Sequence, residues 1–99
     1  MRSFLHVARV DDWEAARARG EYAVPEGRDP FTHACFPEQL PGVLERFYAG
    51  TPRETLVLLE VDPAGLPVRL EAAGDGAGDF PHVYGPIPVA SVTTARPVP

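Results

Sequence analysis

The sequence predicts a small α+β domain with a split, mostly antiparallel β-sheet and two short helices. Three observations support this fold class. The chain has 99 residues, which is enough for one modest hydrophobic core. Two segments have helical signals, and five or six short runs resemble strands. These helices and strands do not alternate strictly, so we expect one α+β domain over residues 1–99, with a Pro-rich tail at residues 95–99.

The chain begins with a predicted strand followed by a predicted helix. Residues 4–9 alternate loosely in side-chain type, as is typical of a strand covered on both faces. Residues 12–19 predict a short helix, because Asp11 suits the N-cap and Glu14 stands at capping-box spacing. Gly20 is a suitable C-terminal stop for this helix.

A loop and a second strand are expected next. Residues 21–30 combine Pro, Gly and charge without periodicity, which indicates a surface loop. Residues 31–36 alternate and are rich in aromatic side chains, which favours a strand. This alternation puts Phe31, His33 and Cys35 on one face.

The second helix is predicted by an apolar stripe. The stripe has the helical spacing i, i+3, i+4, i+7 and i+8, and consists of Leu40, Val43, Leu44, Phe47 and Tyr48. Gly50 ends it, and Pro41 must lie near the first turn, because deeper in the helix it would remove a backbone hydrogen bond.

The second half of the chain predicts short strands separated by turns. Residues 55–61 are the most apolar run and indicate a central strand. Residues 62–65 have the composition of a turn, and residues 68–71 return as a strand. Residues 72–79 are polar and rich in glycine, which indicates a flexible loop that could act as a lid. The remaining expected strands are residues 80–84 and 89–94.

Composition excludes several functions. The chain has fourteen acidic residues against nine basic ones, and all nine are Arg because the sequence contains no Lys. A lysine Schiff base and a P-loop lysine are therefore impossible. A net charge of -5 without a basic run disfavours DNA as a partner. We expect a monomer whose partner is a small molecule.

Cysteine content and hydropathy indicate the compartment. The single Cys35 excludes an internal disulfide and a four-cysteine zinc site. The sequence has no apolar run of membrane-spanning length, and its first residues lack the apolar region of a secretory signal. A cytoplasmic protein without membrane contact is the resulting expectation.

The three histidines share one sequence environment. His6, His33 and His82 each lie within an expected strand, with apolar or small side chains two residues away on the same face. A buried ring nitrogen without a partner costs about 1–3 kcal/mol, so either the fold or a ligand must satisfy it. Each histidine alone suits a satisfied core position. If two or more converge, they would form a polar cluster within an aromatic wall, as in small-molecule sites.

Three kinds of site can be built from these residues. His33 and Cys35 with a further histidine could hold a metal ion, and Cys35 beside a histidine could be a nucleophile. Neither has a tight motif, and Cys35 also suits a buried hydrophobic position. In the third arrangement, Glu71 at a strand end could stabilise a developing glycosyl cation. Histidine would then hold ribose hydroxyls and Tyr84 would stack on a base.

Ordered segments along nearly the whole chain carry a family resemblance. The most specific are the block Phe-Pro-His-Val-Tyr-Gly-Pro at residues 80–86 and the block Phe-Thr-His-Ala-Cys at residues 31–35. The others are His6 and residues 13–16, 20–22, 37–39, 59–62 and 68–71. Together they resemble the bacterial family catalogued as domain of unknown function 952.

The resemblance implies a fold similar to the ADP-ribosyltransferase superfamily, with a split sheet around an NAD-type cleft. By position it implies that His6 contacts the nicotinamide ribose and that Glu71 supports transfer. It also places His33, His82 and Tyr84 along the cleft. The expected activity is ADP-ribosyl transfer or hydrolysis with NAD as substrate and without a metal. The alternatives are a noncatalytic module that binds a small ligand and a His/Cys metal-site hydrolase.

Overall fold

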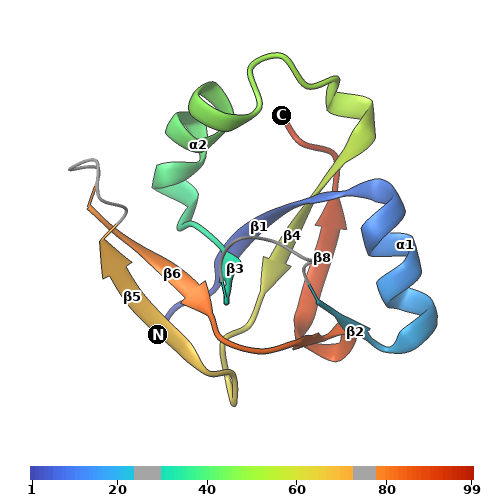
Figure 1. The fold of residues 1–99 in the computed structure, drawn as a ribbon, viewed down its shortest axis with the longest axis vertical. Coiled ribbons are helices and arrows are strands. Elements are labelled where there is room, and N and C mark those ends of the chain that lie inside the picture. Colours follow the sequence, from blue (N-terminus) through green and yellow to red (C-terminus); the bar gives the residue numbers. More distant parts are fainter. Residues whose placement is uncertain (24–29, 73–77) are drawn as a thin grey trace.

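The computed structural model describes residues 1–23, 30–72 and 78–99, and within them it has an α+β fold with antiparallel sheets (Figure 1). One three-stranded sheet has the order β1 (Phe4–Arg9), β4 (Leu56–Val61) and β8 (Val92–Arg96). A second has the order β3 (Thr32–His33), β6 (Asp79–Val83) and β5 (Val68–Ala72). A two-stranded sheet joins β2 (Glu21–Tyr22) to β7 (Ile87–Pro88), and the helices are α1 (Val10–Arg19) and α2 (Leu40–Phe47). The predicted fold class and the central position of the most apolar strand are confirmed.

Strands β1 and β4 divide the core into two clusters. They pair antiparallel, and successive side chains of a strand point to opposite faces. Phe4 and Ala8 of β1 therefore pack in the first cluster, whereas Leu5 and Val7 pack in the second. The prediction that this strand is covered on both faces is confirmed, because all of its residues except Arg9 are buried.

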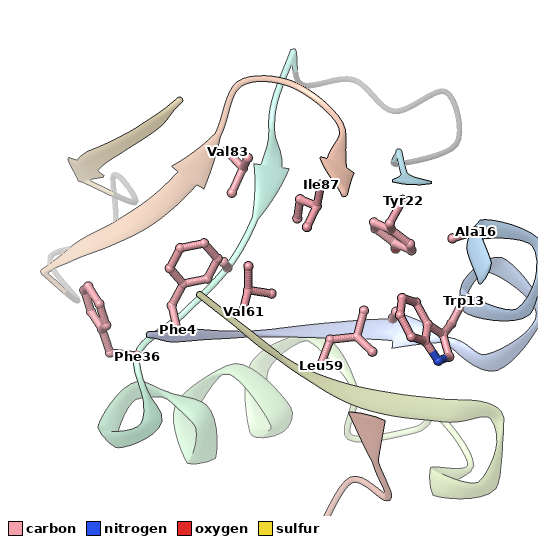
Figure 2. Packing of buried hydrophobic residues seen from close by; sticks show 11 residues of the cluster. Phe4, Trp13, Ala16, Tyr22, Phe36, Leu59, Val61, Val83 and Ile87 are labelled. Carbon is pink, nitrogen blue, oxygen red and sulfur yellow. The ribbon is translucent and has the colours of Figure 1, made fainter. Parts of the chain in front are cut away.

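The first cluster joins the β1–β4 pair to the other two sheets. Figure 2 shows Phe4, Leu59 and Val61 pointing from β1 and β4 toward Val83 of β6 and Ile87 of β7. All five side chains are almost completely enclosed. This cluster fixes the β3–β6–β5 sheet against the β1–β4–β8 sheet.

The second cluster lies under α2. Leu40 and Leu44 of the helix pack there with Leu58 of β4 and with Val98 near the C-terminus. Phe47 has the spacing of the same helical stripe, yet its side chain is 65% exposed. The cluster does not extend as far as this last residue of the helix.

The helix starts differ from the sequence expectation. α1 begins at Val10, two residues earlier than predicted, and its N-cap is Arg9 without a side-chain cap. Asp11 and Asp12 lie in the first turn instead, where negative charge interacts favourably with the helix dipole. In α2 the expected first-turn position of Pro41 is confirmed.

Several strand boundaries also differ. Glu21–Tyr22, expected in a loop, form β2, and residues 24–29 lie outside the described residues. The strand expected at 31–36 shortens to Thr32–His33, because Cys35 instead forms a backbone bridge with Leu5. Tertiary pairing explains both changes, since a two-residue strand has little intrinsic preference of its own.

The C-terminal segment is more ordered than predicted. Val89–Ser91 form a short 3₁₀ helix, so the last strand begins only at Val92. That strand continues to Arg96, and Val98 is buried in the second core cluster. The glycine-rich loop and its expected lid role lie mostly at 73–77, outside the described residues.

No helix in the described ranges is both long and apolar enough to cross a membrane.

Two glycines, one at the end of α1 and one inside α2, allow the assigned backbone conformations to be tested by substitution with alanine. Gly20 ends α1 with φ of 91°, a left-handed conformation that costs other residues about 1–2 kcal/mol. Gly42 lies inside α2 without a positive φ, and a Cβ there would meet open space. We expect Gly20→Ala to lower the free energy of unfolding by about 1 kcal/mol and Gly42→Ala to raise it by up to about 1 kcal/mol. Urea denaturation measures both, and equal effects would contradict the prediction.

Candidate functional site

The β3–β6–β5 sheet brings four of the predicted site residues together. His82 of β6 lies directly opposite His33 of β3 on one side and Arg69 of β5 on the other. Directly opposite residues of antiparallel strands share a face, so these three nitrogen-bearing side chains form a row. Glu71 and Tyr84 stand two residues from Arg69 and His82 along their segments and therefore flank the row.

Glu71 is held by two donors. Its Oε1 accepts a hydrogen bond from Nδ1 of His82 at 2.9 Å and another from the hydroxyl of Tyr84. Both bonds lower the pKa of the Glu71 carboxyl, and the bond from Tyr84 has the larger effect. The carboxyl is therefore ionised at neutral pH. The side chain is 36% exposed, and within the described residues no hydrogen bond reaches Oε2. Half of this carboxylate is available to an external donor.

Aromatic side chains form a wall beside the carboxylate. The ring of Phe31 stacks on His82, with centroids 4.0 Å apart and planes 13° from parallel. The same phenyl ring lies 4.8 Å from the ring of His33 and 5.2 Å from that of Tyr84. The guanidinium of Arg69 lies 4.6 Å from the centroid of the Tyr84 ring, a cation–π contact. Mutual packing therefore restricts the ring orientations.

His6 lies behind this face, in the core. A carbonyl oxygen can only accept, so Nδ1 of His6 donates to the backbone oxygen of His33 at 2.6 Å. Nε2 then accepts from the hydroxyl of Tyr22 at 2.9 Å. Burial lowers the pKa of His6 to about 4, and the ring is neutral at pH 7. Both nitrogens are thus occupied by the protein, and His6 acts on the site by holding the His33 backbone.

The sequence matches a known protein family over most of its length. The family model described as "Protein of unknown function (DUF952)" matches residues 7–95. The chain belongs to the DUF952 family. The family expected from the sequence is therefore confirmed.

Solved structures similar to this DUF952 chain come from protein CC0527 of Caulobacter crescentus. Its crystal structure has 29% sequence identity and a TM-score of 0.84, and the match covers 98% of this chain and 86% of that one. Its solution NMR structure has 28% identity and a TM-score of 0.76, with coverage of 99% and 85%. No curated protein matches the sequence. Neither the family nor these structures indicate the ADP-ribosyltransferase superfamily.

Cys35 of this DUF952 chain is enclosed in the second core cluster. Its side chain is buried, and its backbone pairs with Leu5 through two hydrogen bonds of 2.7 and 2.8 Å. Burial raises the pKa of the Cys35 thiol to about 11, so the thiol is protonated at neutral pH. These observations favour the buried hydrophobic role over the nucleophilic one.

A metal site finds no support in the part of the chain that the structure describes. Within residues 1–23, 30–72 and 78–99, no three His, Cys, Asp or Glu side chains are grouped so that they could hold an ion. The two-residue spacing of His33 and Cys35 does not put them together, because His33 is exposed and Cys35 is in the core. The chain leaves the β3 strand between them, so strand alternation no longer applies.

Sequence reasoning missed three residues of this arrangement. Phe31 was expected on the face of His33 but not as a stacking partner of His82. Arg69 was overlooked, although its spacing of two residues from Glu71 in an expected strand puts both on one face. Tyr22, which fixes His6, fell in an expected loop, and its signal in the sequence was its place in the 20–22 segment that carries the family resemblance.

Proposed function

We propose that the face formed by Phe31, His33, Arg69, Glu71, His82 and Tyr84 binds NAD or a related nucleotide, and that Glu71 supports ADP-ribosyl transfer or hydrolysis. One observation carries this proposal: Glu71 is a partly exposed carboxylate whose Oε1 is fixed by His82 and Tyr84 while Oε2 stays available. Fixed acceptors of this kind orient a polar ligand without having to be reorganised.

The neighbouring groups suit the parts of a nucleotide. The rings of Phe31 and Tyr84 offer apolar surface for a planar base, and Glu71 Oε2 can accept from ribose hydroxyls. Arg69 is exposed and supplies a permanent positive charge for a phosphate. The resemblance implies that His6 contacts the nicotinamide ribose. The ring of His6 is enclosed behind the face, so in this proposal Glu71 makes the ribose contact instead.

The chemistry would be dissociative. The bond between the ribosyl carbon and nicotinamide breaks, and its electron pair leaves with nicotinamide. The ribosyl centre becomes oxocarbenium-like, and the ionised Glu71 opposite it stabilises the positive charge. Water or another hydroxyl then adds to this centre and loses a proton.

Glu71→Gln tests the proposal against a matched control. Glu60 of β4 is also 36% exposed and also bonds to a neighbouring strand, through Arg96 at 3.0 Å, but it lies outside the face. We expect titration calorimetry of the wild type with NAD or ADP-ribose to release heat. Glu71→Gln should weaken binding about tenfold and lower nicotinamide release about 100-fold, whereas Glu60→Gln should change neither.

The same measurements separate catalysis from binding alone. The noncatalytic alternative rests on the same observation, since an acceptor fixed by two donors at Oε1 can serve recognition without chemistry. In that case Glu71→Gln would still weaken binding, but the wild type would release no nicotinamide. No heat with NAD, ADP-ribose or nicotinamide up to millimolar concentration would contradict both forms of the proposal.

A further inference from the structure

His82 has one ring nitrogen that the proposed binding role does not use. Its side chain is 6% exposed, and Nδ1 faces Glu71. No hydrogen bond from the described residues reaches Nε2. Within the described residues, every fully enclosed side-chain nitrogen or oxygen has a hydrogen-bond partner. Because Nε2 of His82 has no such partner there, it is not fully enclosed and must have contact with solvent. An otherwise buried imidazole therefore presents one nitrogen to the outside.

The partners of His82 determine which nitrogen carries the proton. The ionised Glu71 carboxylate can only accept, so at neutral pH Nδ1 carries a proton and donates it over 2.9 Å. In the neutral imidazole the lone pair is then on Nε2. The stack with Phe31, 4.0 Å away and nearly parallel, restricts rotation of the ring. A carboxylate that orients an imidazole in this way is the usual arrangement of an enzymatic base.

We propose that His82 is the general base of the reaction at this face, with Glu71 as the residue that orients it. This inference rests on the proposed function. Nε2 takes one proton from the attacking water as the water oxygen bonds to the ribosyl carbon. The bond from that carbon to nicotinamide has broken before this step, and nicotinamide has left with the electron pair. The second proton of the water stays on the new hydroxyl, and the imidazolium later releases its proton to solvent.

The base role implies a pH dependence. The titratable and charged groups that face His82 within the described residues are His33 from β3, Arg69 and Glu71 from β5, and Tyr84, which directly follows β6. A protonated imidazole has no lone pair at Nε2, so protonation of His82 would abolish the base. Substitution of His82 should therefore remove the part of the pH dependence of turnover that this group causes.

Two measurements test the inference. Long-range proton–nitrogen NMR spectra of the wild type should show His82 protonated at Nδ1 and unprotonated at Nε2 at pH 8, with no ligand needed. His82→Gln should lower nicotinamide release at least 100-fold and change the KM for NAD less than threefold. Glu60→Gln is the control for turnover, and thermal unfolding checks that each variant is folded.

The outcomes separate this inference from the proposed function. A His82 ring protonated at Nε2, or wild-type turnover in His82→Gln, would overturn the base role and leave nucleotide binding standing. Absence of NAD binding by the wild type would overturn the proposed function, and the base role in this reaction with it. If His82→Gln does not fold, the NMR spectrum of the wild type still decides whether Nε2 is poised to accept a proton.

Discussion

Replacement of Phe4 by Ala should lower the free energy of unfolding by about 3–5 kcal/mol, the largest stability effect that we expect from a single substitution. The Phe4 side chain is completely buried in the first core cluster, opposite Val61 of β4. It lies where the β1–β4 pair contacts the residues of β6 and β7 (Figure 2). Truncation removes a large apolar surface and leaves a cavity between the sheets. Domains of this size have about 5–15 kcal/mol of stability in total.

Phe47→Ala is the matched control, because it removes the same atoms from a side chain that is 65% exposed. Its effect should be about 0.5 kcal/mol or less. Chemical denaturation followed by tryptophan fluorescence measures both, since Trp13 lies in the first cluster. Phe4→Leu, which keeps most of the volume, should cost less than about 1.5 kcal/mol and covers the case in which Phe4→Ala does not fold. Similar losses for Phe4→Ala and Phe47→Ala would contradict the assigned core.

The second large effect is a loss of stability between pH 6.5 and pH 4 caused by His6. In the unfolded chain this imidazole titrates near pH 6.5, whereas burial lowers the pKa of the folded His6 to about 4. Between these values the unfolded state binds a proton that the folded state does not, so acid favours unfolding. The full contribution is present above pH 6.5 and is lost as the pH falls toward 4. A shift of this size corresponds to about 3 kcal/mol.

His6→Asn tests the assignment. The Asn amide can still donate to the His33 carbonyl but cannot titrate, so the variant should lose most of the slope between pH 6.5 and 4.5 even if it is less stable throughout. The pKa values of Glu38 and Glu71 are lowered, and their stabilisation is lost only as the pH falls below about 4.5. Denaturation midpoints at several pH values measure the slope. If the pH dependence of stability is unchanged in His6→Asn, a group other than His6 causes it.

The sequence predicts the long elements of this fold well. The β1 strand, the apolar β4 strand and the stripe of α2 each carry their signal within the element itself. Strands β2 and β7 were missed and β3 was predicted too long, because these strands have two residues each and exist through their partners. Residues 95–99 were expected as a Pro-rich tail, and only the packing of Val98 in the second cluster shows that this residue contributes to the core.

The candidate site was predicted in part. From residue types and the family resemblance, four side chains were expected to lie together: His33, Glu71, His82 and Tyr84. The structure brings them to one face. Their roles and the nucleotide remain predictions. The sequence treated the three histidines alike, because each has apolar neighbours two residues away. Only the fold separates His6, with both nitrogens bonded, from His82, with one nitrogen exposed to solvent.

By itself the sequence determined the family, the α+β class and the absence of lysine, which restricts a permanent positive charge in any site to arginine. Those properties depend on residue identity and local spacing. The tertiary structure alone decided that Arg69, His82 and His33 form one row and that Cys35 is enclosed. The physical reason is that register between distant strands, and not spacing along the chain, determines which side chains share a face and which nitrogen stays open.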